Sequence, residues 1–185
     1  MDRRIFIQNS VIGLGVGLMP GIAMGANLLQ SNANSNSAAN LNPKIVRDGE
    51  GEVLNVIGDV QTHKLVGSET NNQIVEWVDD VDPGVGIPPH IHTKEDEIFR
   101  VVKGQVEIMV GGKTTVLEAG DTAFAPKNVA HSWTVVGTEK AKMITSAFPA
   151  GIEKMFGELA ALPAGPPDFG KVAQICGSHG VTFVK

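Results

Sequence analysis

The chain contains no tyrosine, a single cysteine and no cluster of positive charge beyond its N-terminus. The lone Cys176 rules out an intrachain disulfide, and its place on the apolar side of a candidate helix favours a small core residue over a reactive thiol. The formal net charge is −5, and a chain without a basic stripe is not expected to bind nucleic acid. Its length of 185 residues suits one domain preceded by a leader.

The first residues resemble a bacterial export signal of the twin-arginine type. Arg3 and Arg4 precede an uncharged, mildly apolar stretch that Pro20 and several glycines interrupt. The resemblance implies a signal peptide over residues 1–29, a periplasmic or secreted protein, and membrane contact only through this leader. A general secretory signal and an uncleaved membrane anchor are the alternatives, although Pro20 and the glycines lower the helix stability that an anchor needs.

Residues 30–43 are rich in asparagine, serine and alanine and nearly free of bulky apolar side chains. Such a segment cannot bury enough apolar surface to offset the entropy lost on ordering, so we expect a disordered linker. The folded part then begins at Lys44, with a barrel over residues 44–148 and a helical tail with a short strand over residues 149–185.

Short segments with alternating apolar residues, separated by glycine-containing breaks, fill the region before residue 149. The predicted strands cover residues 53–57, 63–66, 73–78, 97–102, 105–110, 114–117, 122–125, 130–136 and 143–147. Gly111-Gly112 lies between two of them where a tight hairpin is expected. Many short strands at regular spacing predict an all-β sandwich or closed barrel.

The pattern changes to a helical period after Pro149. Ile152, Met155, Phe156 and Leu159 recur on one side of a predicted helix. Asp168 is placed to cap a second helix, which ends near residue 180, and residues 181–184 read as a last strand. The sequence thus predicts a C-terminal pair of helices that packs on the barrel or on a second subunit.

Four residues in the strand region read as a metal site: His90, His92, Glu97 and His131. Two histidines separated by one residue point the same way on an extended segment, because side chains alternate along a strand. Imidazole nitrogens and a carboxylate suit a divalent transition metal, which could be manganese, iron, nickel, cobalt or zinc. The residue types alone do not choose among these metals.

The spacing around these residues resembles the two motifs of the cupin superfamily. The motifs run Gly84, His90-x-His92, Glu97 and Gly104, and then Gly120, Pro126 and His131. The resemblance implies a jelly-roll barrel whose three histidines and one glutamate bind a metal inside it, and it implies a homodimer. Two positions depart from the pattern: Asn128 replaces a glycine in a turn, and Val135 replaces an asparagine that is not a ligand.

The neighbouring polar and aromatic residues have less definite roles. Glu95 and Asp96 are expected to be solvated, although an alternative ligand among them is open. Trp133 shares the strand parity of His131, so it either lines the pocket or packs in the core. His63 and His179 lack a comparable context and are expected to be structural or solvated.

The helical tail resembles that of small bacterial cupins related to quercetin dioxygenases. That resemblance implies a metal-dependent dioxygenase that acts on a small hydroxylated, aromatic or flavonol-like substrate, with Glu97 as the catalytic residue that accepts a substrate proton. A non-catalytic cupin that binds or senses a small molecule is the first alternative, because the fold alone does not settle activity. An enzyme resembling oxalate oxidase is the second.

Overall fold

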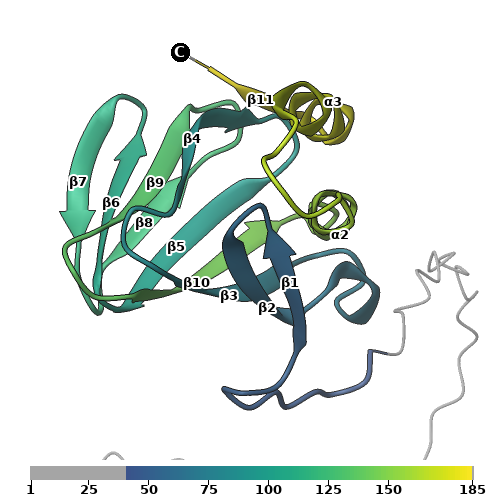
Figure 1. Cartoon of the computed structure of the whole chain (residues 1–185). Coiled ribbons are helices and arrows are strands. Elements are labelled where there is room, and N and C mark those ends of the chain that lie inside the picture. Colours follow the sequence, from purple (N-terminus) through teal and green to yellow (C-terminus); the bar gives the residue numbers. More distant parts are fainter. Residues whose placement is uncertain (1–40, 185) are drawn as a thin grey trace, which may run out of the picture. The chain divides into compact units, whose positions relative to one another are not determined.

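The computed structural model describes residues 41–184, so the predicted leader and most of the predicted linker lie outside the described residues. Eleven strands form two antiparallel sheets that pack around an apolar core (Figure 1). The six-stranded sheet has the order β1-β2-β3-β10-β5-β8, and the five-stranded sheet has the order β11-β4-β9-β6-β7. The predicted all-β jelly-roll barrel with two C-terminal helices is confirmed.

The strands of the six-stranded sheet are β1 (Glu52–Val56), β2 (Asp59–Leu65), β3 (Val75–Val81), β5 (Asp96–Lys103), β8 (Thr122–Ala125) and β10 (Ala141–Phe148). Those of the five-stranded sheet are β4 (Gly86–His92), β6 (Gln105–Val110), β7 (Lys113–Leu117), β9 (His131–Val136) and β11 (Val181–Phe183). A short 3-10 turn, Gly67–Glu69, connects β2 to β3. Burial alternates along β9, where His131, Trp133 and Val135 face inward, as one buried sheet face requires.

The strand that carries the two neighbouring histidines, β4, was absent from the predicted strands. Pro88 and Pro89 lie in its middle, and proline lacks the N–H that a sheet ladder needs, which weakens the strand pattern. In the structure the β4–β9 register shifts between Ile87 and His90, where these prolines stand. The second difference is at β2, which begins at Asp59 because residues 57 and 58 form a two-residue turn with positive φ.

The C-terminal tail forms part of the barrel. Helices α2 (Glu153–Ala160) and α3 (Phe169–His179) bury Phe156, Leu159 and Cys176 in a second apolar cluster with β1 and β3 residues. The predicted cap is confirmed, since the Asp168 side chain accepts hydrogen bonds from the amides of residues 170 and 171. Strand β11 then pairs with β4. No helix among residues 41–184 is both long enough and apolar enough to span a membrane.

The close approach of β4 to β9 depends on Gly86. A Cβ atom at this position would lie 2.3 Å from the Trp133 carbonyl oxygen and 2.7 Å from Thr134 Cα, so the backbones would have to separate. We expect Gly86→Ala to lower the free energy of unfolding by about 1–3 kcal/mol, measured by urea denaturation with tryptophan fluorescence. Gly157→Ala is the matched control, because its Cβ would meet open space on α2 and should stabilise the helix. Equal stability of Gly86→Ala and wild-type protein would contradict this packing.

Candidate metal centre

The four predicted site residues come from both sheets. His90 and His92 project inward from β4, and His131, directly opposite His90 in the ladder, projects from β9. Glu97 projects from β5 in the other sheet. All four side chains are buried, with exposures of 1–5%. The structure therefore brings together every residue that the sequence predicted for this site, although the identity of what they bind stays a prediction.

The distances fit one divalent transition metal. One potential ligand atom from each side chain lies within 4.8 Å of the others. His131 Nε2 is 3.0 Å from Glu97 Oε2, and His92 Nε2 is 3.9 Å from the same oxygen. Nitrogen and oxygen ligands about 2.1 Å from a common ion lie roughly 3–4 Å apart, so only small inward movements are needed. The three imidazoles and one carboxylate could thus hold such an ion.

Hydrogen bonds on the outer side orient two of the imidazoles. His90 Nδ1 lies 2.9 Å from the Pro88 carbonyl oxygen, and His131 Nδ1 lies 3.0 Å from the Val129 carbonyl oxygen. Each Nδ1 that donates to a carbonyl leaves its Nε2 facing the centre, as metal-binding histidines require. Burial, helped by the neighbouring imidazoles, lowers the His90 pKa to about 4, so this ring is neutral at pH 7 and its lone pair is free for a metal.

Neighbouring charged groups favour the ionised forms of His92 and Glu97. Burial opposes charge on His92, but the carboxylates of Glu97 and Glu95 outweigh it and raise the His92 pKa. Burial likewise opposes ionisation of Glu97, but the three imidazoles outweigh it and lower the Glu97 pKa. Glu97 is therefore anionic at neutral pH, as a ligand of a divalent cation would need to be.

The turn before β9 shows how the unusual Asn128 is accommodated. Its φ of 64° is left-handed, a conformation that asparagine tolerates better than most residues. The Asn128 amide donates to the His92 carbonyl oxygen at 2.7 Å, so the turn that precedes His131 is joined to the strand that carries His92. Val135, the other departure, is buried in the apolar core between the sheets.

A cavity of about 560 Å³ opens onto the centre between the barrel and the C-terminal helices. His90, His92 and Glu97 line it, together with the aromatic side chains of residues 77, 99, 133 and 156. Trp133 lines the pocket and also packs in the apolar core, so both alternatives that the sequence allowed for it are correct. No lysine or arginine is among the described residues that line this cavity. The pocket suits an uncharged, largely apolar molecule with few polar groups.

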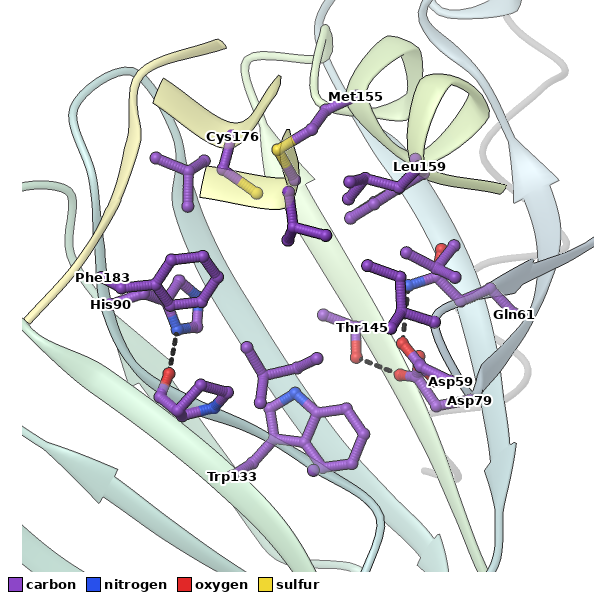
Figure 2. Close-up of a pocket in the computed structure, with 18 of the residues that line it drawn as sticks. Asp59, Gln61, Asp79, His90, Trp133, Thr145, Met155, Leu159, Cys176 and Phe183 are labelled. Carbon is purple, nitrogen blue, oxygen red and sulfur yellow. Dashed lines mark hydrogen bonds between the residues drawn. The ribbon is translucent and has the colours of Figure 1, made fainter. Parts of the chain in front are cut away.

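A buried carboxyl pair, Asp59 and Asp79, stands in the same pocket, on the side opposite His90 in Figure 2. Asp79 accepts hydrogen bonds from Trp77 Nε1 at 2.8 Å and Thr145 Oγ1 at 2.6 Å, and Gln61 Nε2 donates to Asp59 Oδ2 at 2.7 Å. Burial raises the Asp59 pKa to about 6, and burial with the nearby Asp59 charge raises the Asp79 pKa well above its usual range. No motif or spacing along the chain predicted this pair, because the two residues come from different strands, β2 and β3.

The other residues that the sequence singled out are not part of the ligand set. His63 is buried beside Trp77 and Phe156, and burial lowers its pKa, so it is structural as expected. His179 bonds the Glu158 carboxylate at 2.9 Å at the end of α3. Cys176 is a buried core residue, as predicted. Glu95 was expected to be solvated, and this is wrong: its side chain is only 4% exposed, because the turn before β5 points it inward.

Comparison with known proteins agrees with this architecture. Residues 77–147 match the family model described as a cupin domain. The chain is 28% identical over 99 residues to the pectin degradation protein KdgF of Dickeya dadantii (strain 3937), a match that covers 50% of this chain and 88% of that protein. It is 30% identical over 96 residues to oxalate oxidase GF-2.8 of Triticum aestivum, covering 48% of this chain and 43% of the relative.

The solved structures show the same fold. The structure of KdgF from a Halomonas species superposes with a TM-score of 0.53 at 19% identity, covering 61% of this chain and 99% of that one. At this identity the likeness shows the fold alone, and the family match lies in residues 77–147. Over those residues the chain matches the cupin domain family, and its two facing sheets form the fold of a cupin jelly roll.

Proposed function

We propose that this protein is a metal-dependent dioxygenase that acts on a small hydroxylated aromatic molecule, of the flavonol or catechol kind. The observation that carries the proposal is that the four candidate ligands lie at a cavity that is lined by aromatic side chains and, among residues 41–184, by no lysine or arginine. A planar phenol fits such walls, and its hydroxyl oxygens are donors that a transition metal accepts.

In this proposal, different residues bind the metal, accept the substrate proton and contact the substrate ring. The three histidines and Glu97 would hold the ion, which when bound supplies Lewis acidity and, if redox-active, a route for electrons to dioxygen. Glu97 would also accept the substrate hydroxyl proton, since its lowered pKa leaves it ionised, and its carboxylate lines the cavity. Trp133 and Phe99 would stack against the substrate ring and exclude water from the reacting side.

Oxygen dependence tests the proposal directly. Protein loaded separately with iron, manganese, cobalt and nickel is incubated with a flavonol and catechol panel, in air and under anaerobic conditions. We expect oxygen uptake matched to substrate loss in air with at least one metal, and no product without oxygen. Glu97→Gln should lower the rate by roughly 100-fold or more, as loss of a proton acceptor does. Product formation that is indifferent to oxygen across the panel would rule the proposal out.

A second candidate function, turnover of oxalate or of a pectin-derived uronate, is suggested by similar proteins. The chain resembles an oxalate oxidase and a pectin degradation protein, so oxalate and pectin-derived uronates belong in the same panel. Both kinds of compound are anionic at pH 7, and the part of the chain that the structure describes places no lysine or arginine in the cavity to bind a second carboxylate. Turnover of oxalate by manganese-loaded protein, with no reaction of any phenol, would favour this candidate over the aromatic one.

A further inference from the structure

His92 differs from the other two histidines of the centre in the hydrogen bonding of its Nδ1 atom. His90 and His131 each direct Nδ1 at the carbonyl oxygen two residues earlier in the chain. His92 Nδ1 has no hydrogen-bond partner among the described residues, although it is buried. A buried, unpaired donor is costly, and a metal-binding imidazole normally has its second nitrogen held.

The Glu95 carboxylate is the group that faces this nitrogen. Glu95 Oε2 is likewise buried and unpaired, and it lies 3.7 Å from His92 Nδ1. The two side chains are 3–4% exposed, so water does not compete for either atom. A distance of 3.7 Å is too long for a hydrogen bond, but a small rotation of the Glu95 side chain would close it. Each group is thus the available partner of the other.

The backbone around Glu95 holds it in this position. Thr93 bonds the Gly180 carbonyl oxygen through both its amide, at 2.9 Å, and its hydroxyl, at 3.0 Å. Asp96 Oδ1 accepts the Lys127 amide at 2.7 Å. The turn that carries Glu95 is therefore fixed on one side by the C-terminal tail and on the other by the segment before His131.

We propose that Glu95 is a positioning residue for His92: its carboxylate accepts a hydrogen bond from the Nδ1–H group and so fixes Nε2 as the atom that binds the metal. Glu95 is not itself among the candidate ligands, because within residues 41–184 the potential ligand atoms that lie within 4.8 Å of one another belong to His90, His92, Glu97 and His131. The inference rests on the metal centre of the proposed function but not on its oxygen chemistry.

Zinc binding tests the proposal without turnover. Zinc affinity is measured by competition with a chelator for wild-type protein, Glu95→Ala, the isosteric Glu95→Gln and the control Glu107→Gln. We expect roughly 10–100-fold weaker binding for Glu95→Ala, as loss of an outer-shell partner costs, and a smaller loss for Glu95→Gln, whose amide oxygen still accepts a hydrogen bond. Glu107→Gln removes one negative charge from an exposed position on β6 and should bind zinc like the wild type.

Nuclear magnetic resonance of the diamagnetic zinc form supplies the second readout. Nitrogen-15 spectra of the wild type should show His92 protonated at Nδ1 and zinc-bound at Nε2, with that proton exchanging faster in Glu95→Ala. Unchanged affinity in both Glu95 variants, an equal loss in Glu107→Gln, or zinc bound through His92 Nδ1 would overturn the proposal. Absence of zinc binding by the wild type would overturn the metal centre as well, whereas a lack of oxygen chemistry would leave this inference standing.

Discussion

Replacing His131 by alanine is expected to weaken zinc binding by about two orders of magnitude. The side chain is 1% exposed, and its Nε2 lies 3.0 Å from Glu97 Oε2, at the middle of the ligand set. Four-ligand zinc sites have binding free energies of roughly 10–16 kcal/mol, so each ligand contributes roughly 3 kcal/mol. Losing one ligand therefore weakens the affinity by about 100-fold. We therefore expect the zinc dissociation constant of His131→Ala to rise by about 100-fold or more.

His179→Ala is the matched control for this experiment. His179 lies at the end of α3 and bonds Glu158, away from the ligand set, so its loss should leave zinc affinity unchanged. Circular dichroism and the urea midpoint, measured in chelator, separate lost ligation from lost folding. Zinc binding by His131→Ala at wild-type affinity would show that the four side chains do not act as one site.

Asp59→Asn is expected to stabilise the protein at neutral and alkaline pH. The Asp59 pKa is raised from 3.8 to about 6, mainly by burial, so the folded state holds a proton that the unfolded state releases. A raised pKa means that stability is highest below about pH 4 and is lost as the pH rises toward 6. The shift corresponds to roughly 3 kcal/mol at 1.36 kcal/mol per unit, and asparagine removes this cost while keeping the shape.

Urea unfolding at pH 4.5 and pH 8, with chelator present, measures the effect. We expect Asp59→Asn to exceed wild-type stability by about 2–3 kcal/mol at pH 8 and by much less at pH 4.5. Glu76→Gln is the control on the same strand as Asp79, since its carboxylate bonds Ser146 outside the pair and should show no such dependence. A variant that is less stable than wild type at pH 8 would show that the Asp59 charge is compensated in the fold.

The candidate site was more predictable than its surroundings because its residues match the motifs of a known family. Side-chain alternation alone places only His90 and His92 on one face of an extended segment. The expectation that Glu97 and His131 lie beside them came from the resemblance to the two cupin motifs. The left-handed turn at Asn128 followed from residue type.

The features that were missed depend on how distant segments meet. β4 was not among the predicted strands, because Pro88 and Pro89 obscure it while β9 and β11 hold it in the sheet. Glu95 and Asp96 looked like a solvated rim beside Glu97, yet Glu95 is buried because Gly180, from the tail, holds the turn beside it. Asp59 and Asp79 meet only through the register of β2 and β3, which no spacing along the chain reveals.

Anomalous diffraction from crystals of zinc-loaded protein shows whether the four side chains bind one metal ion. We expect one anomalous peak per chain, about 2.0–2.2 Å from Nε2 of His90, His92 and His131 and from a Glu97 oxygen. A peak bound by other residues, or no peak at these four side chains at saturating zinc, would show that they do not form a metal centre.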